Sequence, residues 1–175
     1  IAIGVCFAFL VHSWTAGGVI QLKGTVTDAV TAAIPVQFIA ALVGTSFFAV
    51  LFGVPRKYYF AAGVVGVLGW MVYILMSRYT PMGDFGSTFL SATMVAFLSR
   101  YAAIKLKCPS TVFLICGIFP LIPGAGVFWS AYYIASTQLE SAIMMGLSSV
   151  KLTLAIVLGI IVAANVFHSS NWKSK

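Results

Sequence analysis

The chain has 175 residues, of which 61% are hydrophobic and only 7% are charged, with a formal net charge of +7. A soluble domain has about a quarter of its residues charged, so this composition excludes a soluble domain of any size. The mean hydropathy of +1.07 agrees, and an all-α polytopic membrane protein is predicted. Because the basic residues lie in short gaps between apolar runs, nucleic-acid binding is excluded as well.

Apolar runs of membrane-spanning length recur along the chain. A transmembrane helix needs about 20 mostly apolar residues. Five core spans are predicted at 34–53, 58–77, 86–103, 111–135 and 143–167. An extra N-terminal span over 1–20 is interrupted by His12 and Ser13, and a polar linker follows it. The predicted divisions are an extra hydrophobic segment with its linker, a five-helix domain and a basic tail, at 1–33, 34–167 and 168–175.

The charged residues between the spans predict an orientation. Cytoplasmic loops of membrane proteins carry an excess of lysine and arginine. One side of the predicted bundle holds a set of cations: Arg56, Lys57, Arg100, Lys105, Lys107, Lys173 and Lys175. The other side holds a mixed set: Lys23, Asp28, Arg78, Asp84 and Glu140. The first side, and with it the C-terminus, is therefore expected to be cytoplasmic.

Small residues recur at helix-packing intervals in two of the spans. They lie three apart in the third apolar run and four apart in the last, at Gly63, Gly66, Gly69, Ala155, Gly159 and Ala163. Such spacing lets helix backbones approach closely in lipid. The alternative is that glycine is simply common in membrane helices.

A proline- and glycine-rich segment interrupts the fourth core span. Pro120 and Pro123 each remove a backbone donor. Gly124 and Gly126 can adopt backbone angles closed to other residues. Because apolar residues continue on both sides, a helix break at membrane depth is predicted, and broken helices commonly form transporter sites. The alternatives are a proline kink or a surface turn between two short helices.

Lys151 is the second candidate feature. The apolar run that follows it, 152–167, covers only about 24 Å as a helix, so the span must begin upstream, near Ile143, and include the lysine. Ser148, Lys151, Ala155 and Gly159 then lie on one stripe, which is expected to face a partner helix or a cavity. The alternative is that the lysine extends to the membrane interface.

The remaining polar residues predict no enzyme, metal site or cofactor. Cys6, Cys108 and Cys116 have no metal-ligand spacing, and His12 and His168 are single. No carboxylate lies in mid-membrane, and neither a phosphate loop nor a nucleophile–base pair is present.

Three stretches carry a family resemblance. PSTVFLICGIFPLIPGAGVFW, at 109–129, resembles a signature of the threonine/serine exporter family, in its C-terminal or small-subunit membrane domain. FFAVLFGVPRKYYFAAGVVGVLGW and GLSSVKLTLAIVLGII are similar to the opening and the last helix of that domain. The resemblance covers roughly 34–167. It implies a five-helix domain of a bacterial cytoplasmic (inner) membrane protein, working beside a related larger domain or subunit and able to oligomerise. That larger domain is absent from this sequence. Residues 1–33 precede the usual start of the small domain, and they are interpreted either as an extension or as the end of a preceding domain.

The resulting functional hypothesis is a subunit or domain of a secondary transporter that exports threonine and serine. On this hypothesis Lys151 attracts the substrate carboxylate. The other residues expected on the substrate path supply hydroxyl groups or form the helix break: Ser148, Ser149, Thr111, Pro120, Pro123, Gly124 and Gly126. The alternatives are a dicarboxylate (succinate) exporter subunit and a non-transporting assembly subunit.

Overall fold

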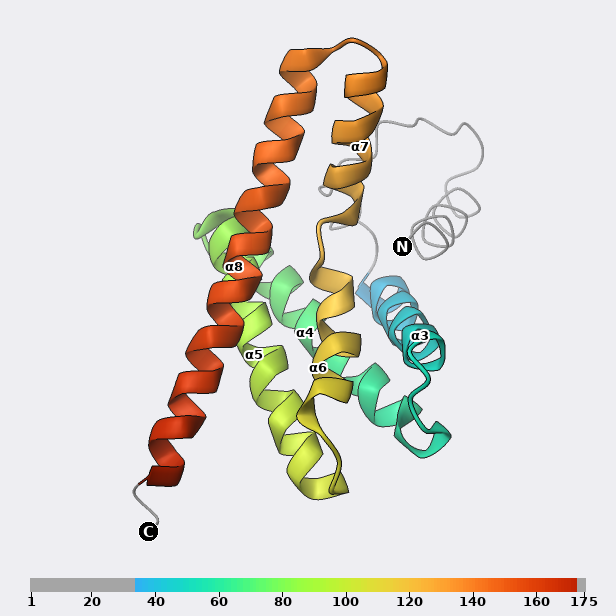
Figure 1. Ribbon diagram of the computed structural model, residues 1–175, viewed down its shortest axis with the longest axis vertical. Helices are drawn as coiled ribbons and strands as arrows, with labels where there is room; N and C mark the ends of the chain where they lie inside the picture. The colour runs from blue at the N-terminus through green and yellow to red at the C-terminus, as the bar shows by residue number, and fades with distance from the viewer. Residues whose placement is uncertain (1–33, 173–175) are drawn as a thin grey trace.

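A computed structural model describes residues 34–172, apart from the side chains of Ile34, Val36 and 167–172 (Figure 1). The predicted N-terminal span and linker within 1–33, and the tail cations Lys173 and Lys175, lie outside the described residues. The described part is all helical and contains no strand. Its elements are α3 (Ile34–Leu51), η1 (Arg56–Tyr58), α4 (Tyr59–Tyr79), α5 (Gly83–Leu106), α6 (Ser110–Ile118), η2 (Phe119–Leu121), α7 (Gly124–Ala135) and α8 (Leu139–Trp172).

Three of these helical stretches are long and apolar enough to cross a membrane: Arg56–Tyr79, Gly83–Leu106 and Leu139–Val166. The α6–α7 pair adds a fourth if it forms one bent span, whereas the apolar part of α3, Gln37–Leu51, is shorter. The described residues therefore hold three or four candidate spans, and the fifth core span remains a prediction.

The outer surface of the bundle is apolar. Large hydrophobic side chains on different helices are strongly exposed, including Phe47 at 69%, Phe60 at 76% and Ile104 at 70%. A soluble protein rarely exposes so much apolar surface, whereas a bilayer covers it without cost. The surface therefore agrees with the helix lengths in describing a membrane protein.

Helix α4 packs between α3 and α5 through its glycines. A Cβ added at Gly63 or Gly66 would collide with side chains of α3, and one added at Gly69 would collide with Val95 of α5. The hydroxyl of Ser91 on α5 donates a hydrogen bond to the Gly69 carbonyl. Absent side chains thus let α4 approach both neighbours closely, as small residues do in membrane bundles.

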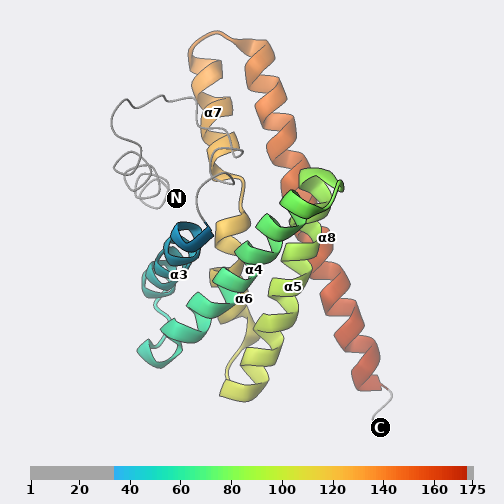
Figure 2. The same cartoon turned by 180° about the vertical axis from the view of Figure 1, so that it is seen from behind.

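Helix α8 is longer than the other helices and has two partners. Its C-terminal half packs on α5, where Ala155 and Ala163 are fully buried and Gly159 lies against the backbone of α5. Its N-terminal half pairs with α7, and this hairpin projects beyond the other helices (Figures 1 and 2). Ser130 of α7 donates a hydrogen bond of 2.9 Å to the Ala142 carbonyl of α8 and so joins the two helices.

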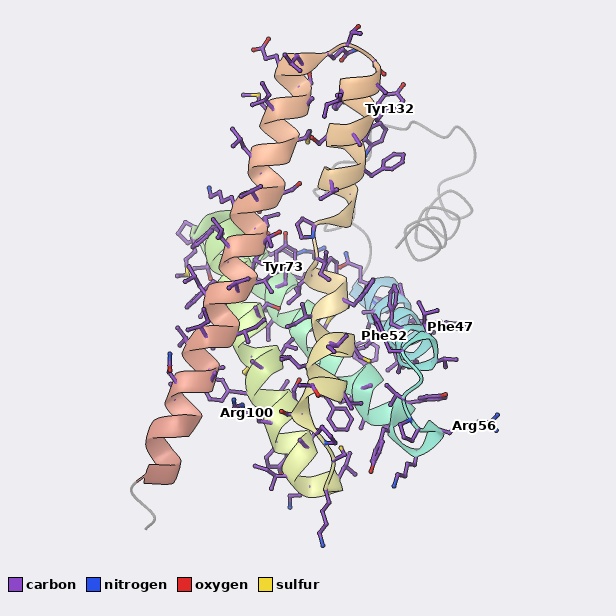
Figure 3. All side chains as sticks on the ribbon, in the orientation of Figure 1. Phe47, Phe52, Arg56, Tyr73, Arg100 and Tyr132 are labelled. Atoms are coloured by element: carbon purple, nitrogen blue, oxygen red, sulfur yellow. The ribbon has the colours of Figure 1, made fainter. Side chains whose placement is uncertain are left out.

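Two cation-bearing connections meet at one end of the bundle. The Tyr58 hydroxyl, next to Arg56 and Lys57, donates to the Leu106 carbonyl at the end of α5 at 3.3 Å. Figure 3 shows Arg56 and Arg100 towards this same end, and Tyr132 of α7 at the opposite one. The fold therefore places Arg56 and Arg100 towards the same end of the bundle, and the orientation itself stays a prediction.

Candidate functional site

The helix break predicted at 120–126 is present. Helix α6 ends at Ile118, η2 follows, and α7 begins at Gly124 with its axis bent by 52° from α6. Pro120 cannot donate to the carbonyl four residues before it, and Pro123 cannot donate to that of Phe119. The Phe119 carbonyl instead accepts the Ile122 N–H at 3.3 Å, in the tighter 3₁₀ pattern.

The break is held in place by aromatic packing. The ring of Phe119 in η2 lies 3.5 Å from that of Phe48 and 6.0 Å from that of Phe52, centroid to centroid, and both partners belong to the end of α3 or follow it directly. Pro120 and Pro123 are half-buried. Helix α3 therefore supports the last turn before the break, and α8 supports the helix after it.

The prediction that the glycines supply unusual backbone angles is wrong. Gly124 and Gly126 are the first and third residues of α7 and have helical conformation, whereas the described glycines with positive φ are Gly53 and Gly83. The physical reason for Gly126 is space, because a Cβ there would collide with the hydroxyl of Ser149 on α8.

Gly126 and Ser149, two residues expected on the substrate path, are therefore in contact. Ser149 is 5% exposed, and its hydroxyl donates to the Met145 carbonyl at 2.9 Å, which leaves its oxygen able to accept a hydrogen bond. In the first turn of α7 the Gly124 and Val127 N–H groups are bonded to the Ile122 and Pro123 carbonyls, and the N–H groups of Ala125 and Gly126 lie between them at the positive end of the helix. Groups of these kinds are the ones that bind a carboxylate or a small polar group in proteins.

The stripe predicted around Lys151 does not pack as a unit within this chain. Ala155 and Gly159 are buried against α5, but Lys151 and Ser148 are exposed. The physical reason is that α5 packs against the C-terminal half of α8, whereas α7 pairs with the N-terminal half through another face, on which Ser149 lies. Lys151 follows Ser149 by two residues, at about the level of the break, but lies on a different face of α8.

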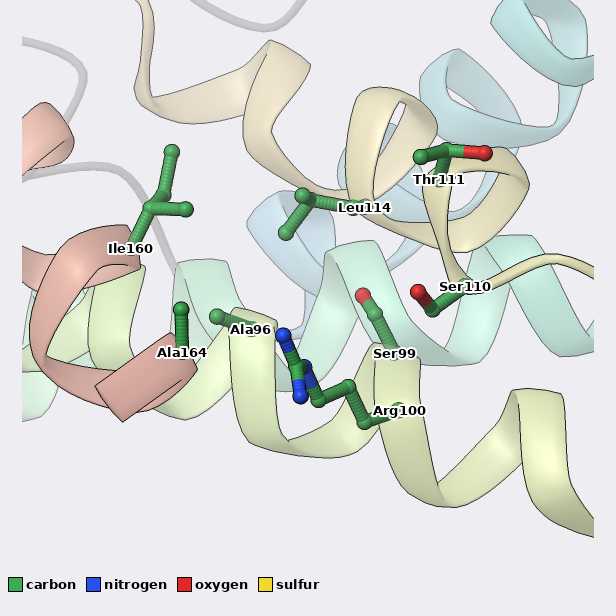
Figure 4. Close-up of a pocket in the computed structure, with 8 residues that line it drawn as sticks. All are labelled: Ala96, Ser99, Arg100, Ser110, Thr111, Leu114, Ile160 and Ala164. Atoms are coloured by element: carbon green, nitrogen blue, oxygen red, sulfur yellow. The ribbon is translucent and has the colours of Figure 1, made fainter. Parts of the chain in front are cut away.

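A small cavity lies at the other end of α6 (Figure 4). Its volume is about 140 Å³, and α5, α6 and α8 line it with Ala96, Ser99, Arg100, Ser110, Thr111, Leu114, Ile160 and Ala164. Thr111 was expected on the substrate path, but its hydroxyl points away from those of Ser99 and Ser110 (Figure 4). The structure thus places Thr111 apart from the break, in the lining of the same cavity as Arg100.

Sequence reasoning missed this cavity because Arg100 was assigned to orientation alone. A usable signal was present, since Arg100 falls inside the predicted span 86–103 and lies well before the end of α5. A charged residue inside an apolar span is a functional-site hypothesis by default. Within the described residues, no cluster of three or more histidine, cysteine or acidic side chains could hold a metal ion.

Comparison with known proteins identifies the family to which this geometry belongs. The family model described as "Threonine/Serine exporter, ThrE" matches residues 37–166, most of the chain. No curated protein and no solved structure matches the chain.

Proposed function

Because the chain belongs to the threonine/serine exporter family, we propose that it is a subunit or domain of a secondary transporter that exports threonine and serine. On this proposal it works with a larger related membrane domain. The observation that carries it is the family match over 37–166, which includes the broken α6–α7 pair. Broken helices are a recurrent way in which transporters form a substrate site at membrane depth.

The break supplies the groups that an amino-acid substrate needs. The first turn of α7 offers N–H donors and a positive dipole end to the substrate carboxylate. Ser149, in contact with Gly126, adds a hydroxyl whose oxygen can accept from the substrate ammonium or hydroxyl group. Pro120 and Pro123 keep the break open, since neither can restore the missing helical hydrogen bonds.

Lys151 contributes to transport at the junction with the larger domain on this proposal. A lysine inside an apolar helix costs about 2.5–3.5 kcal/mol on insertion scales, so a partner or water is expected to cover it. Lys151 and Ser148 are exposed on the same part of α8, at the level of the break. A partner placed there would close the substrate path from the side that this chain leaves open.

Lys151→Ala tests this role. Because the side chain is exposed, its removal should leave expression and folding unchanged, whereas threonine and serine efflux should fall strongly. Intact efflux at matched expression would show that the lysine only extends to the interface.

Efflux of preloaded threonine and serine from exporter-deficient cells tests the function itself. The chain is expressed alone and together with its genomic neighbour, and efflux that requires both would support the two-part exporter. Competition by succinate in place of serine would assign a dicarboxylate exporter. Absence of efflux of either class, with substitutions at the break disturbing only complex formation, would assign an assembly role.

The proposed location is the bacterial cytoplasmic membrane, with five core spans and a cytoplasmic C-terminus. The grouping of Arg56 and Arg100 at one end of the bundle supports this orientation. A C-terminal green fluorescent protein fusion should therefore be fluorescent, and a C-terminal alkaline phosphatase fusion inactive. The opposite pair of results would reverse the orientation.

A further inference from the structure

The cavity between α5, α6 and α8 is separate from the break. It surrounds the first turn of α6, whereas the break follows the last turn of that helix. Ile122 follows Ser110 by 12 positions, which places the two about 18 Å apart along the chain at a helical rise of about 1.5 Å per residue. The cavity lies towards the end of the bundle where the loop cations gather.

The polar wall of the cavity has the chemistry of a carboxylate site. The Arg100 guanidinium is a planar group with five donors that matches a carboxylate with two parallel hydrogen bonds. Arg100 already takes part in an interaction within the protein, and its five donors allow it to bind an anion in addition.

The start of α6 adds to this positive potential. Helix α6 follows Pro109 directly, and no side-chain hydrogen bond caps its first turn. The Ser110 hydroxyl lines the same cavity as Arg100, and the N–H groups of Ser110 and Thr111 lie at the positive end of the helix, where the Val112 N–H is bonded to the Pro109 carbonyl. Ser99 is fully buried and donates its proton to the Val95 carbonyl at 2.7 Å, whereas the partly exposed Ser110 has a hydroxyl oxygen that can accept from a ligand ammonium or hydroxyl group.

The size of the cavity and its apolar lining limit the ligand. A volume of about 140 Å³ is close to the roughly 150 Å³ cavity known to hold one benzene molecule. Leu114, Ile160 and the two lining alanines form an apolar wall that suits a methyl or methylene group. A second carboxylate would meet this wall without a cation, which costs free energy, so a small monocarboxylate fits better than a dicarboxylate.

We propose that the Arg100 cavity is a second substrate-binding site, which captures the carboxylate of a small amino acid before it reaches the break. This inference rests on the proposed export function and adds a site and a substrate preference to it. Arg100 holds the carboxylate, the Ser110 hydroxyl oxygen accepts from the ammonium group, and the apolar lining selects a short side chain. Helix α6 then links the capture site to the break at its other end.

The test uses the full chain, with its partner if efflux requires one, in nanodiscs and in exporter-deficient cells. L-serine binding and the serine concentration for half-maximal efflux are measured for wild type, Arg100→Gln, Arg100→Lys and Lys105→Gln. Lys105 is the matched control, because it lies on α5 near Arg100, is exposed and does not line the cavity. Arg100→Lys keeps the charge that sets membrane orientation but loses the two-pronged geometry.

Arg100→Gln should weaken serine binding and raise the half-maximal concentration by about 10- to 100-fold, the range for losing a hydrogen bond to a charged group. Arg100→Lys should show a smaller rise, and Lys105→Gln should match wild type. Ethanolamine, which lacks the carboxylate, should not compete with serine for binding.

Three outcomes would overturn the inference. If wild type exports serine and Arg100→Gln does so with unchanged affinity, the capture site fails while the exporter function stands. If Arg100→Gln and Lys105→Gln lose efflux equally while Arg100→Lys keeps it, Arg100 acts through orientation alone. Efflux of serine is also measured with added inorganic phosphate and in phosphatidylglycerol vesicles. If Arg100→Gln leaves serine binding intact but abolishes the inhibition of efflux by phosphate, or the dependence of efflux on phosphatidylglycerol, the cavity binds a phosphate group instead. Absence of both efflux and binding in wild type would instead refute the proposed function.

Discussion

The contact between Gly126 and Ser149 gives a quantitative test of how α7 is held against α8. In Gly126→Ala the new Cβ collides with the Ser149 hydroxyl oxygen, while the next atoms, the Ser149 Cβ and the Met145 carbonyl oxygen, lie at 3.6 and 3.8 Å in ordinary contact. The collision therefore involves one oxygen atom. Overpacking of this kind costs about 1–3 kcal/mol, because α7 and α8 must separate or Ser149 must rotate.

The matched control is Gly44→Ala in the middle of α3. A Cβ at Gly44 meets nothing within 4 Å, so this substitution should only stabilise its helix, by about 0.4–1 kcal/mol. Comparing the two alanine variants removes the common gain in helix propensity. Gly126→Ala should therefore melt lower than Gly44→Ala by roughly 2–12 °C, since about 1–3 kcal/mol is lost and each kcal/mol shifts a chain of this size by about 2–4 °C.

The assay is thermal unfolding of each purified variant in the same detergent, followed by tryptophan fluorescence. Ser149→Ala removes the oxygen that collides, so the double variant Gly126→Ala/Ser149→Ala should recover the stability of Ser149→Ala alone. The reasoning is refuted if Gly126→Ala melts with Gly44→Ala, or if removing the Ser149 hydroxyl gives no recovery.

Two further substitutions test the packing of α8 and the break. Gly159→Ala should lower the free energy of unfolding by about 3 kcal/mol in total, the upper end of the range expected for Gly126→Ala. Its Cβ would lie 2.8 Å from the backbone oxygen of Phe89, and no side-chain deletion can relieve a collision with the backbone. The same melting assay checks this, and recovery by Ala92→Gly would contradict it. Pro120→Ala/Pro123→Ala should abolish serine efflux at normal expression, since the restored donors favour a continuous helix. Unchanged efflux would show that transport does not need the break.

The helical membrane class and the position of the break were predictable from the sequence because both depend on local chemistry. An apolar run of membrane length forms a helix, since lipid offers no partner for its backbone groups. A proline lacks a donor wherever it lies, so Pro120 and Pro123 interrupt the α6–α7 pair in any packing arrangement. Small residues at helical spacing likewise predicted close approach, and Gly66 and Gly159 do lie against neighbouring helices.

What each helix face meets was decided by the tertiary structure. Helical spacing places Ser148 and Lys151 near Ala155 on one stripe. Helix α5 packs against the C-terminal half of α8, where Ala155 and Gly159 lie, so the lysine is exposed. The contact of Gly126 with Ser149 joins residues of two helices whose register is set by how α7 pairs with α8. The Arg100 cavity likewise needs three helices to converge, and helical periodicity describes only one helix at a time.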